Sequence, residues 1–317
     1  GRWVAWVSKF VDYWKATDPR RVYTGASVGN SWQWQPHNEY HVKAGARGLS
    51  WAGAQPESES DYRARIDTVK QPYVSHETGQ WCVFPNFNEI RKYTGVNKAK
   101  NFEIFRDILN DNYMGSQSYD FMMASGKLQA LCYKHEIEKT LRTPDYAGFQ
   151  LLALNDYSGQ GTALVGVLDV FFEEKGYINA EQFRRFCSPT VLLARIPKFV
   201  YANNETFHAD IEVSHFGAAP LESAKTVYTI KDKFGKVYAH GTVGTHHIPI
   251  GNLYSLGSVD MTLEGIDTPQ KLNLEVRIEG CDAVNDWDFW VYPAQVELVQ
   301  GTVYTTDTLD AKALAVL

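Results

Sequence analysis

The chain has 317 residues, of which 44% are hydrophobic and 21% charged, and its formal net charge is −6. This composition excludes a largely disordered chain, and the negative net charge argues against binding to a polyanion such as nucleic acid. No apolar run approaches the roughly 20 residues of a membrane-spanning helix, so we expect no membrane insertion. The cysteines form no CxxC pair, and we expect neither a metal site nor a cofactor; they are Cys82, Cys132, Cys187 and Cys281.

Helices and strands alternate over the first 190 residues. Apolar residues recur at helical spacing from Trp3 to Ala16, and Asp18-Pro19 ends this helix. Further helices are predicted over 58–69, 99–112 and 121–143 and from Glu181, with strands near 21–27, 44–51, 72–77 and 146–154. Such units predict a parallel sheet covered by helices. About four units fit, which is half of a (β/α)8 TIM barrel or a smaller open sheet.

The pattern changes near Ile196-Pro197. Short alternating strands follow, separated by turn signals such as Asn203-Asn204; they are predicted over 207–215, 226–231, 236–243, 271–278 and 287–292. This pattern is typical of an immunoglobulin-like β-sandwich. The predicted fold is therefore α/β plus all-β, with the C-terminal half of a TIM barrel over residues 1–196 and a sandwich over 197–293.

The two ends of the chain suggest a longer protein. The first residues already show helical spacing, and the last ones, Leu314–Leu317, are apolar when the chain stops. We therefore expect residues 294–317 to be a linker or the start of a further, truncated domain. Any targeting signal is then expected to lie outside the chain.

Polar residues follow two of the predicted buried strands, where functional residues of parallel α/β folds gather. Glu77 comes at the end of the strand Pro72–His76, and Asn155-Asp156 follows the strand ending at Leu154. Glu77 is a candidate catalytic carboxylate, or else a cap or ion-pair partner at the strand end. Asp156 is a candidate substrate contact, although Asn-Asp followed by Ser-Gly is also common in turns.

Four tryptophans lie in connections after predicted strands: Trp32, Trp34, Trp51 and Trp81. Aromatic side chains in such loops can stack on the apolar face of a sugar ring. They can equally pin long loops to the domain, because a large aromatic side chain buries much apolar surface. We expect Trp51, Trp81 and at least one of Trp32 and Trp34 to lie at the same face as Glu77.

Residues 71–93 (QPYVSHETGQWCVFPNFNEIRKY) resemble the seventh strand and following loop of glycoside hydrolase family 2, the β-galactosidase and β-glucuronidase family. The helix from Trp3 with Thr17–Val22 resembles the fourth barrel helix and fifth strand of that family, and 144–156 resembles its eighth strand. The segment Trp287–Pro293 resembles its immunoglobulin-like domains. The resemblance implies that Glu77 is the nucleophile of a retaining glycosidase, with His76 and Gln80 as possible hydrogen-bond donors.

The resemblance also implies a second carboxylic acid. Retaining glycosidases place a general acid/base about 5–5.5 Å from the nucleophile. In this family it belongs to an Asn-Glu pair after the fourth strand, which would precede Gly1. Asn38-Glu39 and Asn88-Glu89 are Asn-Glu pairs, but they lie in loops after the predicted fifth strand and after the nucleophile. Neither is therefore assigned as the acid/base.

Several interpretations remain open. The resemblance implies an exo-acting, β-galactosidase-like enzyme that hydrolyses O-glycosidic bonds of a carbohydrate substrate, in the periplasm or outside a bacterial cell. The substrate contacts are then His76, Trp81, Trp51, Trp32, Trp34, Asn155 and Asp156. A β-glucuronidase-type member is disfavoured because 166–175 lacks the Asn-x-Lys pair that grips the sugar carboxylate. A non-catalytic carbohydrate-binding relative and a purely structural module are the alternatives, and the oligomeric state is not indicated.

Overall fold

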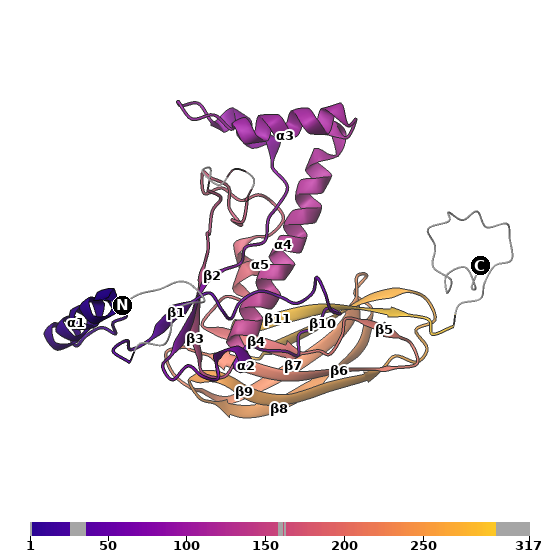
Figure 1. Ribbon diagram of the computed structural model, residues 1–317. Helices are drawn as coiled ribbons and strands as arrows, with labels where there is room; N and C mark the ends of the chain where they lie inside the picture. The colour runs from indigo at the N-terminus through magenta and orange to yellow at the C-terminus, as the bar shows by residue number, and fades with distance from the viewer. Residues whose placement is uncertain (1, 26–35, 158–160, 162, 296–317) are drawn as a thin grey trace.

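The computed structural model describes residues 2–25, 36–157, 161 and 163–295. Figure 1 shows a small parallel sheet beside a long helix that rises from a β-sandwich, while a second helix crosses its far end. The helices are α1 (Arg2–Thr17), α2 (Arg63–Ile66), α3 (Lys100–Asp111), α4 (Ser118–Leu141) and α5 (Ala180–Arg184), with 3-10 turns η1 (Phe87–Lys92) and η2 (Gly115–Gln117). The helices predicted over 3–16, 99–112 and 121–143 are thus confirmed, whereas that predicted over 58–69 is reduced to the short α2.

The parallel sheet has the order β1-β2-β3, with β1 (His41–Lys43), β2 (Tyr73–Thr78) and β3 (Tyr146–Leu151). Both neighbouring pairs are parallel, as predicted for 72–77 and 146–154. The strand predicted near 44–51 lies earlier, at β1, and residues 44–51 form a loop in which Gly48 has φ +82°. Residues 21–25 form no strand, and 26–35 lie outside the described residues. The described part therefore contains a three-stranded parallel sheet, and a half barrel is not confirmed.

The sandwich packs a five-stranded sheet, β5-β11-β10-β7-β8, against a three-stranded sheet, β4-β6-β9. Its strands are β4 (Thr190–Arg195), β5 (Val200–Ala202), β6 (Thr206–His215), β7 (Leu221–Asp232), β8 (Val237–Ile248), β9 (Gly251–Thr262), β10 (Gln270–Ile278) and β11 (Val284–Tyr292). Alternate residues of β11, Trp287, Phe289 and Val291, are buried, and the Phe289 ring stacks on Phe207 with centroids 4.1 Å apart.

The sandwich begins before the predicted boundary. Strand β4 pairs antiparallel with β6, although it precedes Pro197. The boundary at 196/197 is therefore corrected, because it would remove an edge strand whose residues Val191–Ala194 are buried. Alternate residues of β4, Leu192 and Ala194, belong to the sandwich core.

A buried polar seam joins α4 to the sandwich. Glu138 of α4 is fully buried; its Oε1 accepts a hydrogen bond from Asn285 Nδ2 at 2.7 Å, and its Oε2 accepts one from Trp287 Nε1 at 2.9 Å. The Lys134 ammonium donates to Oε1 and, at 2.6 Å, to Asn285 Oδ1. Because every member of this seam is satisfied, α4 is fixed in one orientation on β11.

Candidate functional site

Glu77 lies at the carboxyl end of the central strand of the parallel sheet. The pairing of β2 with β3 shifts register between Ser75 and Thr78, and Glu77 within this irregularity has φ +55°. Few residues other than glycine adopt this left-handed conformation, and such strain is concentrated at functional sites. The Glu77 side chain is 38% exposed, so its carboxylate is open to solvent rather than enclosed in a buried ion pair.

The arginine of the loop after β1 holds this strand end. Arg47 Nη1 donates to the carbonyl oxygens of His76 and Glu77 at 2.7 and 2.8 Å, and it lies 3.4 Å from Glu77 Oε2. Gln80 Nε2 donates to the same carboxylate oxygen at 3.3 Å. Both donors contact Oε2, which restricts the rotation of the carboxylate.

The imidazole of His76 lies on the other side of the carboxylate. Its Nε2 is 3.6 Å from Glu77 Oε1, which is longer than a hydrogen bond, and its Nδ1 is 3.3 Å from Gln150 Oε1 of β3. The structure thus places the His76 ring near Glu77 without a hydrogen bond between them. Glu77 Oε2 therefore has two donors within hydrogen-bonding distance, whereas Oε1, among the described residues, has only the more distant His76 ring beside it.

A buried carboxylate behind the site ties two loops together. Glu136 of α4 is 2% exposed; its Oε1 accepts from the Gly48 backbone N–H and its Oε2 from Trp81 Nε1, both at 2.7 Å. Burial raises the pKa of Glu136, and the hydrogen bonds from Gly48 and Trp81 oppose that rise. Sequence analysis missed Glu136, since its only signal is a carboxylate on an otherwise buried helix face.

The tryptophans do not gather around Glu77 as predicted. Trp81 packs with its indole against the cluster that contains Tyr133 and Ile137. Trp51 packs edge-on against His135 and Phe199, beside the sandwich core. This packing buries apolar surface of the indole away from Glu77. The interpretation of Trp51 as part of a sugar platform at Glu77 is therefore corrected, and Trp32 and Trp34 lie outside the described residues.

Asp156 is a buried structural residue. It is 1% exposed, its Oδ1 accepts from the Gly166 N–H at 2.9 Å, and its Oδ2 pairs with Lys175 Nζ at 2.5 Å. Asn155 donates to the Asp156 carbonyl at 3.0 Å. Asp156 is therefore corrected from a substrate contact to the anchor of the loop after β3, because Gly166 and Lys175 engage both of its carboxylate oxygens.

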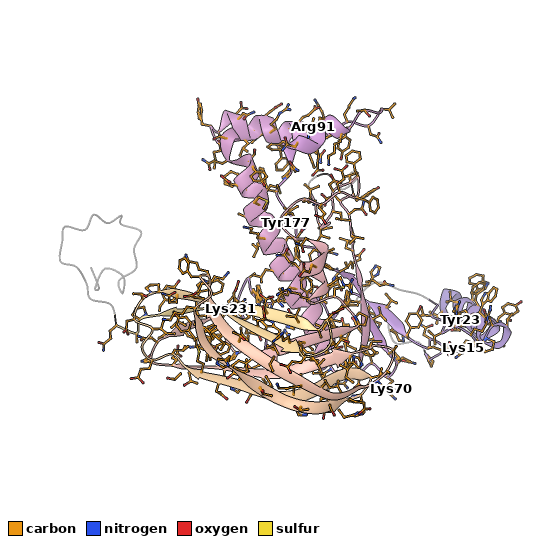
Figure 2. The ribbon with its side chains drawn as sticks, turned by 180° about the vertical axis from the view of Figure 1, so that it is seen from behind. Lys15, Tyr23, Lys70, Arg91, Tyr177 and Lys231 are labelled. Atoms are coloured by element: carbon orange, nitrogen blue, oxygen red, sulfur yellow. The ribbon has the colours of Figure 1, made fainter. Side chains whose placement is uncertain are left out.

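Glu89 is buried within the electrostatic influence of Asp156, Asp169, Lys92 and Lys175. It is 1% exposed and its Oε2 has no hydrogen-bond partner among the described residues. Burial raises the pKa of Glu89 to about 7, helped by the charges of Asp169 and Asp156 and opposed by Lys175 and Lys92. Figure 2 shows Arg91, from the same 3-10 turn, at the end of the molecule far from the sandwich.

Glu89→Gln is expected to stabilise the protein at pH 8 by about 2 kcal/mol and to change little at pH 4.5. A folded-state pKa raised above the ordinary value means that stability is complete below about pH 4.5 and is lost as pH rises toward 7. Urea unfolding followed at both pH values measures this. The exposed neighbour Glu174, changed to Gln, is the control, and an equal effect of Glu89→Gln at both pH values would contradict the prediction.

Glu77→Asn is expected to keep the stability of the parent protein, whereas Glu77→Val is expected to lose about 1–2 kcal/mol. Both changes remove the carboxylate, but only Asn tolerates the left-handed backbone at φ +55°. Thermal unfolding of the pair separates backbone strain from the lost charge. Equal melting temperatures for the two variants would show that the conformation is not constrained.

Two cavities accompany this site without including Glu77. One, of about 600 Å³, lies between α4, α5, β11 and the loop after Trp51, and the other, of about 850 Å³, lies beside α5 and the β10–β11 turn. Within the described ranges, no group of three or more His, Cys, Asp or Glu side chains could hold a metal ion. No helix among these residues is long and apolar enough to cross a membrane.

Comparisons with known proteins give distant similarities. A family model described only as a domain of unknown function, DUF8488, matches residues 205–293, and no curated protein sequence matches the chain. The apo structure of Bacteroides uniformis β-glucuronidase 3 is 13% identical with a TM-score of 0.33, covering 97% of this chain and 36% of that one. B. uniformis β-glucuronidase 2, covalently bound to a cyclophellitol-6-carboxylate aziridine, is 10% identical with a TM-score of 0.33, covering 92% of this chain and 31% of that one.

A smaller part of the chain is similar to a different kind of protein. The CARDB domain of a Pyrococcus furiosus protein, in complex with di-metal ions, is 14% identical with a TM-score of 0.24, covering 33% of this chain and 93% of that one. The chain thus spans about a third of the length of the β-glucuronidases it resembles, at low sequence identity.

Proposed function

We propose that the chain carries the nucleophile of a retaining β-glycosidase, with Glu77 in that role. The supporting observation is a partly exposed carboxylate at the carboxyl end of the central parallel strand, in a strained conformation and held through one oxygen. Arg47 and Gln80 both contact Oε2, so Oε1 is the oxygen available for attack. The resemblance of residues 71–93 to glycoside hydrolase family 2 implies the same role for this position.

The proposed reaction has two displacements. Glu77 Oε1 attacks the anomeric carbon while the bond to the leaving oxygen breaks, and a carboxylic acid protonates that oxygen. Water then attacks the glycosyl ester with the same acid acting as base, which returns the carboxylate and retains the configuration. Arg47 and Gln80 stabilise the charge that Glu77 carries before attack and after release.

The acid/base partner is proposed to come from outside this chain. Glu39 precedes β1, at the opposite end of the strand, and its Oε2 accepts the Tyr23 N–H at 2.8 Å. Glu89 is buried in η1. Neither lies at the carboxyl end of a strand, where a partner for Glu77 is needed.

The substrate class is proposed to be a neutral β-linked sugar, cleaved from a chain end. Arg47 is engaged by two backbone carbonyls, and Lys175 is buried against Asp156. Neither cation is therefore placed to grip the carboxylate of a uronic acid. A β-galactosidase-like specificity fits these surroundings better than a β-glucuronidase-like one.

Covalent labelling tests the proposal directly. The longest polypeptide that the gene encodes is treated with a 2-deoxy-2-fluoro-β-galactoside bearing a good leaving group, and the labelled peptide is mapped by mass spectrometry. A label on Glu77 is expected. A label on another carboxylate, or an inverted product with an unmodified substrate, would refute the assignment, and sugar binding without turnover would favour the non-catalytic relative.

A further inference from the structure

The cleft of about 600 Å³ between α4 and the sandwich has the size and walls of a ligand site. Ligand pockets of about 300–1,000 Å³ are lined by apolar and aromatic groups with a few polar ones. Three indoles line this cleft, from Trp51, Trp287 and Trp290. Trp287 is 2% exposed, while Trp51 and Trp290 are half-buried and present part of their surface to the cleft.

The charged groups around the cleft compensate one another. The Arg185 guanidinium contacts Asp286 at 2.9 Å, and Asp288 contacts Lys271 at 2.6 Å. The Lys134 ammonium donates hydrogen bonds to Glu138 and Asn285 and lies 4.8 Å from the Trp287 ring centroid. Lys127 is exposed to solvent. Because the pairs are internal, the walls do not select a charged ligand.

Two buried polar atoms at the cleft lack partners among the described residues. His135 is 4% exposed and its Nδ1 has no hydrogen bond. The Arg185 side chain is 28% exposed, but its Nε is buried and also has no hydrogen bond. Burial lowers the pKa of His135 well below its ordinary value, so the imidazole is neutral. An unpaired buried polar atom is unfavourable, and a hydroxyl, which both donates and accepts, would satisfy either one.

We propose that this cleft binds a neutral saccharide, with the sugar face stacked on Trp290 and Trp51 and its hydroxyls directed to His135 and Arg185. An apolar ligand would leave the two polar atoms unpaired, and the charges of the walls are already paired, apart from the solvent-exposed Lys127. The site is separate from Glu77, which does not line it. It would hold part of a longer carbohydrate, or a second one, away from the reacting bond.

The test uses the full chain with five uncharged tetrasaccharides, β-1,4-linked glucose, xylose, mannose and galactose and β-1,3-linked glucose. Calorimetry and tryptophan fluorescence are expected to show at least one binding with a Kd of about 1 mM or tighter. Trp290→Ala and Trp51→Ala are each expected to weaken it about tenfold, while Trp14→Ala, on the exposed face of α1, leaves it unchanged. Circular dichroism confirms that the variants fold.

Glu77→Gln keeps this test independent of catalysis, because the cleft should bind the sugar equally well in that variant. The proposal is overturned if none of the five tetrasaccharides binds, or if only an anionic oligogalacturonide binds. It is also overturned if binding survives both tryptophan changes, since the sugar would then occupy another site.

Discussion

Replacing Glu77 by Gln in the longest encoded polypeptide is expected to lower kcat on an aryl β-galactoside by on the order of 10⁴-fold or more. The amide keeps the shape of the side chain and can still receive a hydrogen bond from Gln80, but it cannot form the glycosyl ester. Binding of the intact substrate should change little. Steady-state kinetics on the two proteins, with the variant's Kd measured by calorimetry, separates chemistry from binding.

Two comparisons show whether the loss is chemical. Glu39→Gln and Glu89→Gln are expected to retain most activity, because neither carboxylate is placed for the reaction. Glu77→Ala with added azide should form a glycosyl azide of inverted configuration, since the azide attacks from the vacated side. Activity within tenfold of the parent for Glu77→Gln, or no azide product despite normal sugar binding, would refute the role of Glu77.

Replacing Glu138 by Ala is expected to cost about 3–5 kcal/mol of unfolding free energy. The change leaves the Trp287 N–H, the Asn285 amide and the Lys134 ammonium without their shared acceptor in a buried seam. Chemical unfolding followed by tryptophan fluorescence measures the loss. Because α4 and β11 meet at these atoms, both parts of the molecule should unfold at the lower denaturant concentration.

The control is an ion pair on the surface. Glu103 contacts Lys100 one helical turn away on α3, and the lysine side chain is 75% exposed. Glu103→Ala is expected to change stability by less than about 0.5 kcal/mol, since exposed pairs contribute little. A cost below about 1 kcal/mol for Glu138→Ala would mean that the seam relaxes or admits water.

The sequence predicted those elements whose periodicity reflects burial. Strands β6, β10 and β11 alternate apolar and polar residues, so their positions were predicted correctly. Helix α4 was also predicted correctly, although its buried face includes polar residues such as Gln129 and Glu138. Strand β9 was missed because Gly251 and Gly257 interrupt its pattern; both have positive φ and lie at shifts in the pairing with β6. β4 was missed because a short apolar run does not reveal which core it enters.

Only those parts of the candidate site that depend on residues adjacent in the sequence could be predicted. Glu77 follows the apolar residues of β2, and this local pattern predicted its position at the carboxyl end of that strand. The roles of Arg47 and Glu136 depend on contacts between residues far apart in sequence, which no local pattern encodes. The same limit applies to Trp51, whose partners His135 and Phe199 come from α4 and the sandwich.

The left-handed backbone at Glu77 limits which residues can replace it in related proteins. In a relative that has abandoned catalysis, selection for a carboxylate is lifted, but the register shift of β2 against β3 still demands φ near +55°. Gly, Asn and Asp are the replacements that this geometry accepts most readily, whereas Val, Ile and Thr are the least compatible. A β-branched residue at this position in a relative would therefore indicate that the backbone conformation of the strand has changed. Asn or Gly would indicate that the strand conformation is kept and that only the proposed reaction has been lost.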